Sequence, residues 1–145
     1  MRPMTPEDSA GFSQLDSAGQ LRHLLTLQGV DGDLIRELLA RAQQFVTRPG
    51  QVPAHGKDLA GYTVANLFSE PSTRTRASFE LAAKRLSADV INLDVMLSSR
   101  LKGESMLDTM YTLQAMDVDL FVIRDAQPGV TQYVAEHVEP HVSVV

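Results

Sequence analysis

The sequence predicts an α/β fold, an open parallel sheet of about four strands flanked by helices. From residue 62 onward, short apolar runs rich in β-branched residues alternate with longer amphipathic stretches. The spacing leaves room for one helix between consecutive strands, which is the pattern of right-handed βαβ units and therefore of a parallel sheet. The chain has 145 residues, enough for one domain with a buried core.

The first part of the chain predicts a tail and one helix. Residues 1–18 are mostly small and polar without periodicity, so we expect a flexible tail and a domain over 19–145. After this, Asp31 or Asp33 is expected to cap a helix that the Pro-Gly pair at 49–50 ends. Apolar residues recur there at three- and four-residue steps: Leu34, Ile35, Leu38, Leu39, Ala42 and Phe45.

The alternating part predicts the remaining elements in order. Strands are expected at 62–68, 89–94, 118–123 and 142–145, and helices at 72–86, 103–115 and 129–138. The inward faces of the first two of these helices are expected to be Thr75, Phe79, Ala82, Ala83 and Leu86, and Met106, Leu107, Met110 and Leu113. Because a natural domain rarely ends on an unprotected apolar strand, we expect either that the domain is truncated here or that a partner segment is supplied elsewhere.

Composition excludes several classes of function. Without cysteine there are no disulfides, thiolate metal sites or cysteine nucleophiles, which is compatible with a cytoplasmic protein. No apolar run is long enough for a bilayer and no secretory signal is visible, so no membrane association is expected. A net charge of -5 argues against nucleic-acid binding. The histidines at 23, 55, 137 and 141 lack metal-ligand spacing, so each is expected at the surface and no metal is expected.

The basic residues are unevenly distributed. More than half of the 13 lie in one stretch: Arg74, Arg76, Lys84, Arg85, Arg100, Lys102 and Arg124. An acidic chain that concentrates cations in this way is typical of a protein that binds a small anion. Lys84 and Arg85 are better interpreted as the solvated face of a helix.

The clearest anion-binding pattern follows the first predicted strand, in Ser72-Thr-Arg-Thr-Arg76. With Ser72 as N-cap, the next three amides have no intrahelical partner and lie at the positive end of the helix dipole. Hydroxyls of Ser72, Thr73 and Thr75 add donors, and Arg74 adds a planar fork suited to phosphate. Because residues two apart face differently on a helix, Arg74 is assigned to the ligand, and Arg76 either to a structural role or to the support of residues that touch the ligand. An ordinary capped helix with solvated arginines is the alternative.

Two further cationic segments follow the next strands. The loop before the helix at 103 carries Ser98, Ser99, Arg100 and Lys102, and a solvated surface loop is an equally good interpretation. Arg124 ends the third predicted strand, where a rim salt bridge with Asp125 is the alternative. Since ligands bind at the carboxyl ends of parallel strands, the three segments together predict a phosphorylated small-molecule ligand. The sequence contains neither of the glycine-rich motifs that bind nucleotides, G-x-x-x-x-G-K-(S/T) and G-x-G-x-x-G, so a nucleotide ligand is not favoured.

The motif Ser72-Thr-Arg-Thr-Arg76, followed by Ser78-Phe-Glu80, resembles the signature of the aspartate and ornithine carbamoyltransferases. The resemblance runs from about Leu24 to the C-terminus. Glu70 before Pro71, and the segment Lys102-Gly-Glu, are similar to the aspartate branch, whereas the ornithine branch tends to have lysine before the signature. The tail and serine loop resemble bacterial chains of the pseudomonad type. The resemblance therefore implies the carbamoyl-phosphate-binding domain of an aspartate carbamoyltransferase catalytic chain, without its aspartate-binding domain.

The resemblance also implies roles for the residues. Ser72, Thr73, Arg74 and Thr75 would hold the phosphate, and Thr75 and Arg124 would reach the carbamoyl oxygen. Ser98 or Ser99, with Lys102, would enter from the neighbouring subunit of a homotrimer, and Arg74, Thr75, Lys102 and Arg124 would be catalytic. No cofactor is implied. Association with further pyrimidine-pathway subunits stays open.

Three departures from the family pattern bear on activity. Asp125 stands where the family has histidine, and its carboxylate is expected to repel the anion or sequester Arg124. Ser69 stands where the family commonly has an aromatic residue, and Arg100-Leu101 stands where it has small polar residues. The sequence also stops before the family's His-Pro-Thr-Gln segment. We therefore expect ligand binding without turnover by this chain alone. A non-catalytic paralogue that serves assembly, and an ornithine-type transferase, are the alternatives.

Overall fold

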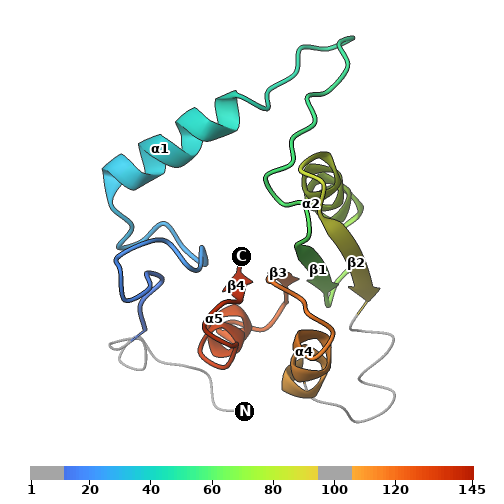
Figure 1. Cartoon of the computed structure of the whole chain (residues 1–145). Coiled ribbons are helices and arrows are strands. Elements are labelled where there is room, and N and C mark those ends of the chain that lie inside the picture. The colour runs from blue at the N-terminus through green and yellow to red at the C-terminus, as the bar shows by residue number, and fades with distance from the viewer. Residues whose placement is uncertain (1–11, 95–105) are drawn as a thin grey trace.

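A computed structural model describes residues 12–94 and 106–145 and shows one parallel four-stranded sheet (Figure 1). The strands are β1 (Thr63–Phe68), β2 (Asp89–Asp94), β3 (Leu120–Arg124) and β4 (Ser143–Val144). Their order is β2-β1-β3-β4, and each neighbouring pair is parallel. The predicted fold class is confirmed, and β1 and β2 lie within a residue of their predicted bounds.

Within the described residues, four helices accompany the sheet: α1 (Gly32–Gln43), α2 (Thr73–Arg85), α4 (Met106–Gln114) and α5 (Val130–Ala135). Helix α2 covers one face of the sheet, and α4 and α5 cover the other (Figure 1). Helix α5 is shorter than the predicted 129–138, and the predicted start of the helix at 103 lies outside the described residues. No helix in the described ranges is long and apolar enough to cross a membrane.

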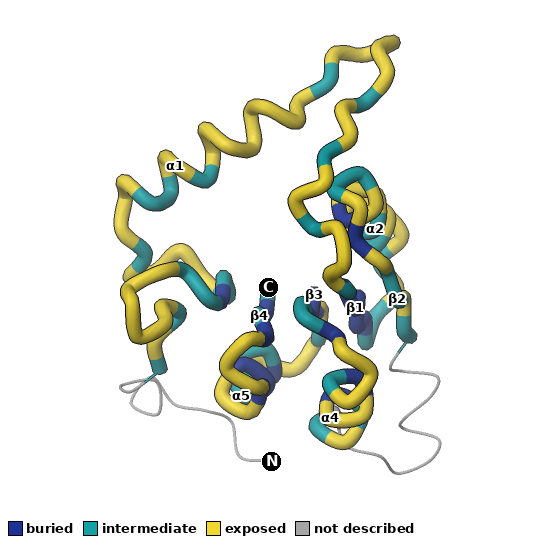
Figure 2. Tube along the Cα trace, viewed as in Figure 1, coloured by how far each residue is buried: buried dark blue, intermediate teal, exposed yellow. Residues whose placement is uncertain are grey.

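The core has two layers because side chains of a strand alternate between its faces. The larger layer joins β1 and β3 to α4 and α5, through Ala65, Leu67, Phe121, Ile123, Met110, Leu113, Val130 and Val134. The smaller layer lies under α2, through Val64, Phe68, Val122, Ala83 and Ala88. Strand β1 is therefore buried from Val64 to Phe68, as the dark tube in Figure 2 shows.

The inward face of α2 differs from the predicted one. Phe79 is 37% exposed and Ala82 is exposed, whereas Arg76 and Glu80 are partly buried on the side of the buried Ala83. The sheet under this helix carries a polar pair, since the side-chain amide of buried Asn66 donates to Asn92 Oδ1 at 2.8 Å. A polar patch on the sheet accommodates polar residues of the helix. The predicted stripe is therefore confirmed at Ala83 and, with partial burial, at Thr75 and Leu86, and it is wrong at Phe79 and Ala82.

The N-terminal segment is bonded to the domain from residue 14 onward, within the predicted tail. The Gln14 side chain accepts from the amides of Leu25 and Thr26 and donates to the Thr26 carbonyl, and its own carbonyl accepts from the amides of Arg22 and His23. The prediction that His23 lies at the surface is wrong. This side chain is 2% exposed, and its Nδ1 accepts a hydrogen bond from the amide of Val144. This segment therefore packs along β4.

Helix α1 begins as predicted and packs less than predicted. Asp31 is its N-cap and accepts from the amides of Asp33 and Leu34. No residue of α1 is buried, and Leu39 is 62% exposed (Figure 2). Phe45 lies beyond the end of the helix and is also exposed. The apolar stripe of α1 thus has little contact with the sheet.

Candidate functional site

The candidate site begins where β1 passes into α2. Pro71 precedes Ser72, which occupies the N-cap position of α2 but makes no hydrogen bond with its side chain to cap the helix. The first intrahelical bond runs from the Arg76 amide to the Ser72 carbonyl. Among the described residues, the amides of Thr73, Arg74 and Thr75 have no acceptor. Three free N–H groups therefore lie at the positive end of a helix dipole, as predicted.

Arg124 joins this helix end from the neighbouring strand. Arg124 ends β3 in register with Phe68, which ends β1. Its Nη1 donates to Thr75 Oγ1 at 3.4 Å, and its Nε donates to Glu70 Oε1 at 2.7 Å. The structure thus brings Thr75 and Arg124 together, as the sequence predicted, and both are at least partly open to solvent.

Glu70 is the residue of this site that the sequence analysis missed. It was noted only as a sign of the aspartate branch, yet it forms the ion pair with Arg124. The sequence could have indicated this contact, because Glu70 comes two residues after β1 and therefore lies at the edge of the sheet where the parallel strands end, called the mouth of the sheet below. A carboxylate that pairs with the guanidinium competes with any anion for it.

Asp125 behaves differently from the expectation. Its Oδ1 accepts from the amide of Gln127 at 2.7 Å, as in a local turn, and the ion pair of Arg124 is with Glu70. The alternative interpretation of the sequence, a rim salt bridge between Arg124 and Asp125, is therefore not found between these two described residues. The expectation that Asp125 sequesters Arg124 is not met: the carboxylate that pairs with Arg124 is that of Glu70.

The two arginines of the signature lie apart, as their spacing predicts. Arg74 is exposed, and its guanidinium has no ion pair or hydrogen bond to any described residue. Arg76 instead contacts Asp94 Oδ2 at 3.4 Å, and its guanidinium carbon lies 5.5 Å from the centroid of the Phe68 ring. Arg74 is thus available to a ligand, whereas Arg76 is held against the sheet.

The remaining predicted residues are accounted for as follows. Ser98, Ser99, Arg100 and Lys102 lie outside the described residues. Lys84 pairs with Glu80 on the same helix, which agrees with a solvated face, and this hydrogen bond lowers the pKa of the Glu80 carboxyl. In the described ranges, no group of three or more His, Asp or Glu side chains is arranged to hold a metal ion.

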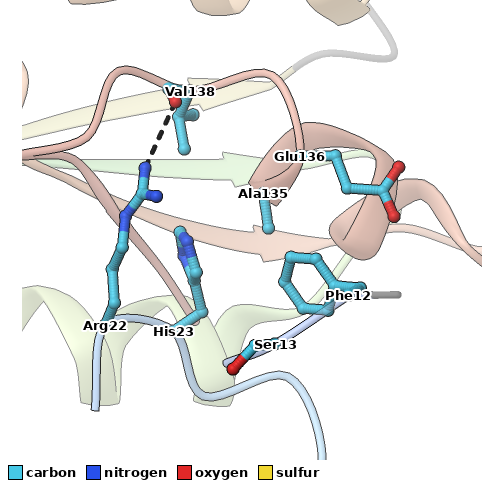
Figure 3. A pocket seen from close by; sticks show the side chains of 7 residues that line it. All are labelled: Phe12, Ser13, Arg22, His23, Ala135, Glu136 and Val138. Atoms are coloured by element: carbon cyan, nitrogen blue, oxygen red, sulfur yellow. Dashed lines mark hydrogen bonds between the residues drawn. The ribbon is translucent and has the colours of Figure 1, made fainter. Parts of the chain in front are cut away.

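A separate cavity of about 410 Å³ lies between the N-terminal segment and α5 (Figure 3). Its polar lining is already used by the fold. Arg22 donates to the carbonyls of Val138, Glu139 and Val142, and the His23 ring bonds to β4. The unused hydrogen-bond donors therefore lie at the mouth of the sheet, where α2 begins, and not in this cavity.

Comparison with known proteins agrees with this geometry. Residues 22–145 match the family model described as "Aspartate/ornithine carbamoyltransferase, carbamoyl-P binding domain". The chain belongs to this family. A likeness to solved structures supports the assignment. A catalytic subunit of the M. jannaschii aspartate transcarbamoylase is 34% identical, with a TM-score of 0.72, over 86% of this chain and 40% of that one.

Two other solved structures are also similar. Ornithine carbamoyltransferase from Thermus thermophilus is 25% identical, with a TM-score of 0.67, over 86% of this chain and 41% of that one. Aspartate transcarbamoylase from Trypanosoma cruzi, in complex with carbamoyl phosphate and aspartate, is 27% identical, with a TM-score of 0.56, over 77% of this chain and 32% of that one. The chain thus spans about 40% of the length of the first aspartate transcarbamoylase relatives.

Proposed function

We propose that this chain binds carbamoyl phosphate at the first turn of α2, as the carbamoyl-phosphate-binding part of an aspartate carbamoyltransferase. The observation that carries the proposal is the set of unused donors at one helix start. The amides of residues 73–75 and the guanidinium of Arg74 have no partner among the described residues. Hydroxyls of Ser72, Thr73 and Thr75 extend the set, and a phosphate dianion matches it in charge and in number of acceptors.

The proposed roles follow from where each group lies. Ser72, Thr73, Arg74 and Thr75 surround the phosphate, and Arg124 beside Thr75 faces the carbamoyl oxygen. In the reaction, the amine of aspartate attacks the carbamoyl carbon and loses a proton, a C–N bond forms, and the C–O bond to phosphate breaks. The guanidinium groups stabilise the oxyanion and the departing phosphate without covalent chemistry of their own. Pyrimidine biosynthesis is the corresponding pathway.

Turnover is proposed for a larger assembly than this chain. Aspartate would bind only to the remainder of a full-length carbamoyltransferase. Ser98 or Ser99, with Lys102, would complete the site of a neighbouring copy in a homotrimer. The aspartate branch is favoured over the ornithine branch by Glu70 and by the higher identity to aspartate transcarbamoylases, 27–34% against 25%.

Titration calorimetry with carbamoyl phosphate and with inorganic phosphate tests the proposal. We expect one anion site whose affinity falls as salt is raised. Arg74→Ala removes a charge-assisted hydrogen bond and should weaken binding by about tenfold or more. Arg85→Ala, in the last turn of the same helix, is the matched control and should leave the affinity unchanged.

The alternative of a non-catalytic assembly protein makes the opposite prediction. It is motivated by Asp125 and by the ion pair that already occupies Arg124. A folded wild-type chain that binds neither anion would favour it. Anion binding separates the two roles: Arg74→Ala should lose phosphate binding that the wild type has if the chain binds carbamoyl phosphate, whereas neither protein should bind phosphate if the chain serves only assembly. Sedimentation is the control, because assembly of the Arg74→Ala variant should be untouched under either role.

A further inference from the structure

We propose that Arg76 is a positioning residue that seats the first turn of α2 on the ends of the strands, and so aims Arg74 and the free amides at the anion. The inference rests on the proposed function and adds a residue that does not itself touch the ligand. It starts from the pairing register of the sheet. Asp94, Phe68 and Arg124 are the last residues of β2, β1 and β3, and Phe68 is in register with both of the others. They form a row across the mouth, called the strand-end row below.

Two consecutive residues of α2 contact this row. Thr75 Oγ1 accepts from Arg124 at one end of the row. Arg76 reaches Asp94 at the other end, with its guanidinium over the central Phe68 ring. Contacts at both ends fix the rotation of the helix about its axis as well as its distance from the sheet. Arg74, which precedes this pair, is thereby directed away from the row and into solvent.

The chemistry of Arg76 suits this role better than simple packing does. Its side chain is 31% exposed, so it is largely removed from water, and its Nε has no hydrogen-bond partner among the described residues. Burying an unpaired donor costs free energy that an apolar side chain would not cost. A planar guanidinium, however, can stack on an aromatic face while its edge donates to a carboxylate. An aliphatic side chain cannot donate to the carboxylate, and an ammonium lacks the planar surface for stacking.

The polar residues beneath α2 support the same interpretation. Asn66, whose Oδ1 is also buried without a partner, donates to Asn92, which lies in register with it on β2. Glu80, one turn after Arg76, is partly buried over this pair, and hydrogen bonds from Lys84 and Asn92 lower its pKa. A charged helix face on a polar patch specifies one register of helix against sheet, whereas an apolar face would permit sliding.

Amide NMR of the whole chain, with a phosphate titration, tests the inference. In Arg76→Gln we expect the amide signals of residues 73–75 to shift and their hydrogen exchange to become faster. We also expect the phosphate Kd to rise by about tenfold, because a site that depends on orientation tolerates a misplacement of about 1 Å poorly. Arg76→Lys keeps the charge but not the planar fork, and should restore less than half of the lost affinity. Arg85→Gln is the matched control on the same helix and should change neither readout.

The outcomes separate the two proposals. Arg74→Ala should lose phosphate binding while the Thr73 and Thr75 amides keep their wild-type exchange rates. Absence of phosphate binding to the wild type would sink the proposed function, whereas the amide readout would still decide the role of Arg76. The positioning role is wrong if Arg76→Gln is folded and keeps both the exchange rates of the amides of residues 73–75 and the phosphate Kd within twofold of wild type. It is also wrong if Arg76→Lys restores phosphate binding fully. Should Arg76→Gln not fold, Phe68→Leu removes the ring beneath the guanidinium and must show the same shifts.

Discussion

At the scale of single residues, the anion site is defined by which donors are already occupied. Arg74 and the first amides of α2 are unoccupied, whereas Arg124 divides its donors between Thr75 and Glu70. The ion pair with Glu70 is partly open to solvent, so its contribution to stability is small, about 1 kcal/mol or less. A ligand can therefore displace Glu70 at modest cost.

The ion pair of Glu70 leads to a prediction about affinity. Glu70→Gln removes the carboxylate that competes for Arg124 and also removes a negative charge from the mouth. We expect phosphate to bind about two- to fivefold more tightly, which corresponds to the free energy of an exposed ion pair. Titration calorimetry at fixed salt measures the change. Glu136→Gln removes a carboxylate that lies far from the mouth on α5's end, and should not change the affinity.

His23 is the other residue whose environment sets a measurable property. Burial, with a smaller contribution from the Arg22 charge, lowers the pKa of His23 from 6.5 to about 4. The folded chain therefore keeps His23 neutral, with Nδ1 accepting from Val144, while the unfolded chain takes up a proton below about pH 6.5. Stability due to the neutral ring is thus complete above pH 6.5 and is lost as the pH falls toward 4.

Urea unfolding between pH 7 and 4 checks this dependence. We expect the free energy of unfolding to fall by roughly 1–3 kcal/mol over that range from this residue alone. His23→Asn keeps an acceptor near the position of Nδ1 but cannot titrate, so its unfolding free energy should fall less steeply. His55→Asn, at an exposed position, should keep the wild-type slope. Equal slopes in wild type and His23→Asn would show that His23 does not couple folding to pH.

At the scale of secondary-structure elements, prediction from sequence succeeded where one local rule dominated. Asp31 caps α1, and β1 and β2 are confirmed because β-branched apolar runs between turn residues have few alternatives. The free amides at residues 73–75 were predicted because helix starts always lack acceptors. The polar part of the inner face of α2 and the burial of His23 were missed, because each depends on a partner distant in sequence: Asn66 and Asn92 in one case, Val144 in the other.

Helix α1 offers a test of how a helix behaves with little packing. Asp31→Ala removes two hydrogen bonds to the amides of Asp33 and Leu34, a change that typically costs ~1 kcal/mol. Since no residue of α1 is buried, we expect the cost to appear as local loss of helix. Circular dichroism should show less helix, with an unchanged urea midpoint. A midpoint that falls by the full cost would mean that α1 unfolds together with the sheet.

At the scale of the whole molecule, stability should decrease from the centre of the sheet outward to α1. Strands β1 and β3 are central, and β1 is bonded on both sides and buried from Val64 to Phe68. By contrast, α1 and the segment after it expose Leu39, Phe45, Val46 and Val52. The site lies between these extremes, because its amides are on the surface while the strand-end row that supports them is part of the central strands.

Hydrogen exchange over a range of urea concentrations measures this gradient. We expect amides of β1 and β3 to exchange only through global unfolding, and amides of α1 to exchange through openings that urea hardly affects, since little surface is exposed when an unpacked helix frays. Leu67→Ala, which leaves a cavity at a fully buried position of β1, should speed exchange throughout the sheet and cost 2–5 kcal/mol. Leu39→Ala, at an exposed position of α1, should change neither the sheet nor the urea midpoint. If the free energy of opening measured for the α1 amides instead equals that of the β1 amides, the helix unfolds together with the sheet. The gradient of stability from the sheet to α1 would then be wrong.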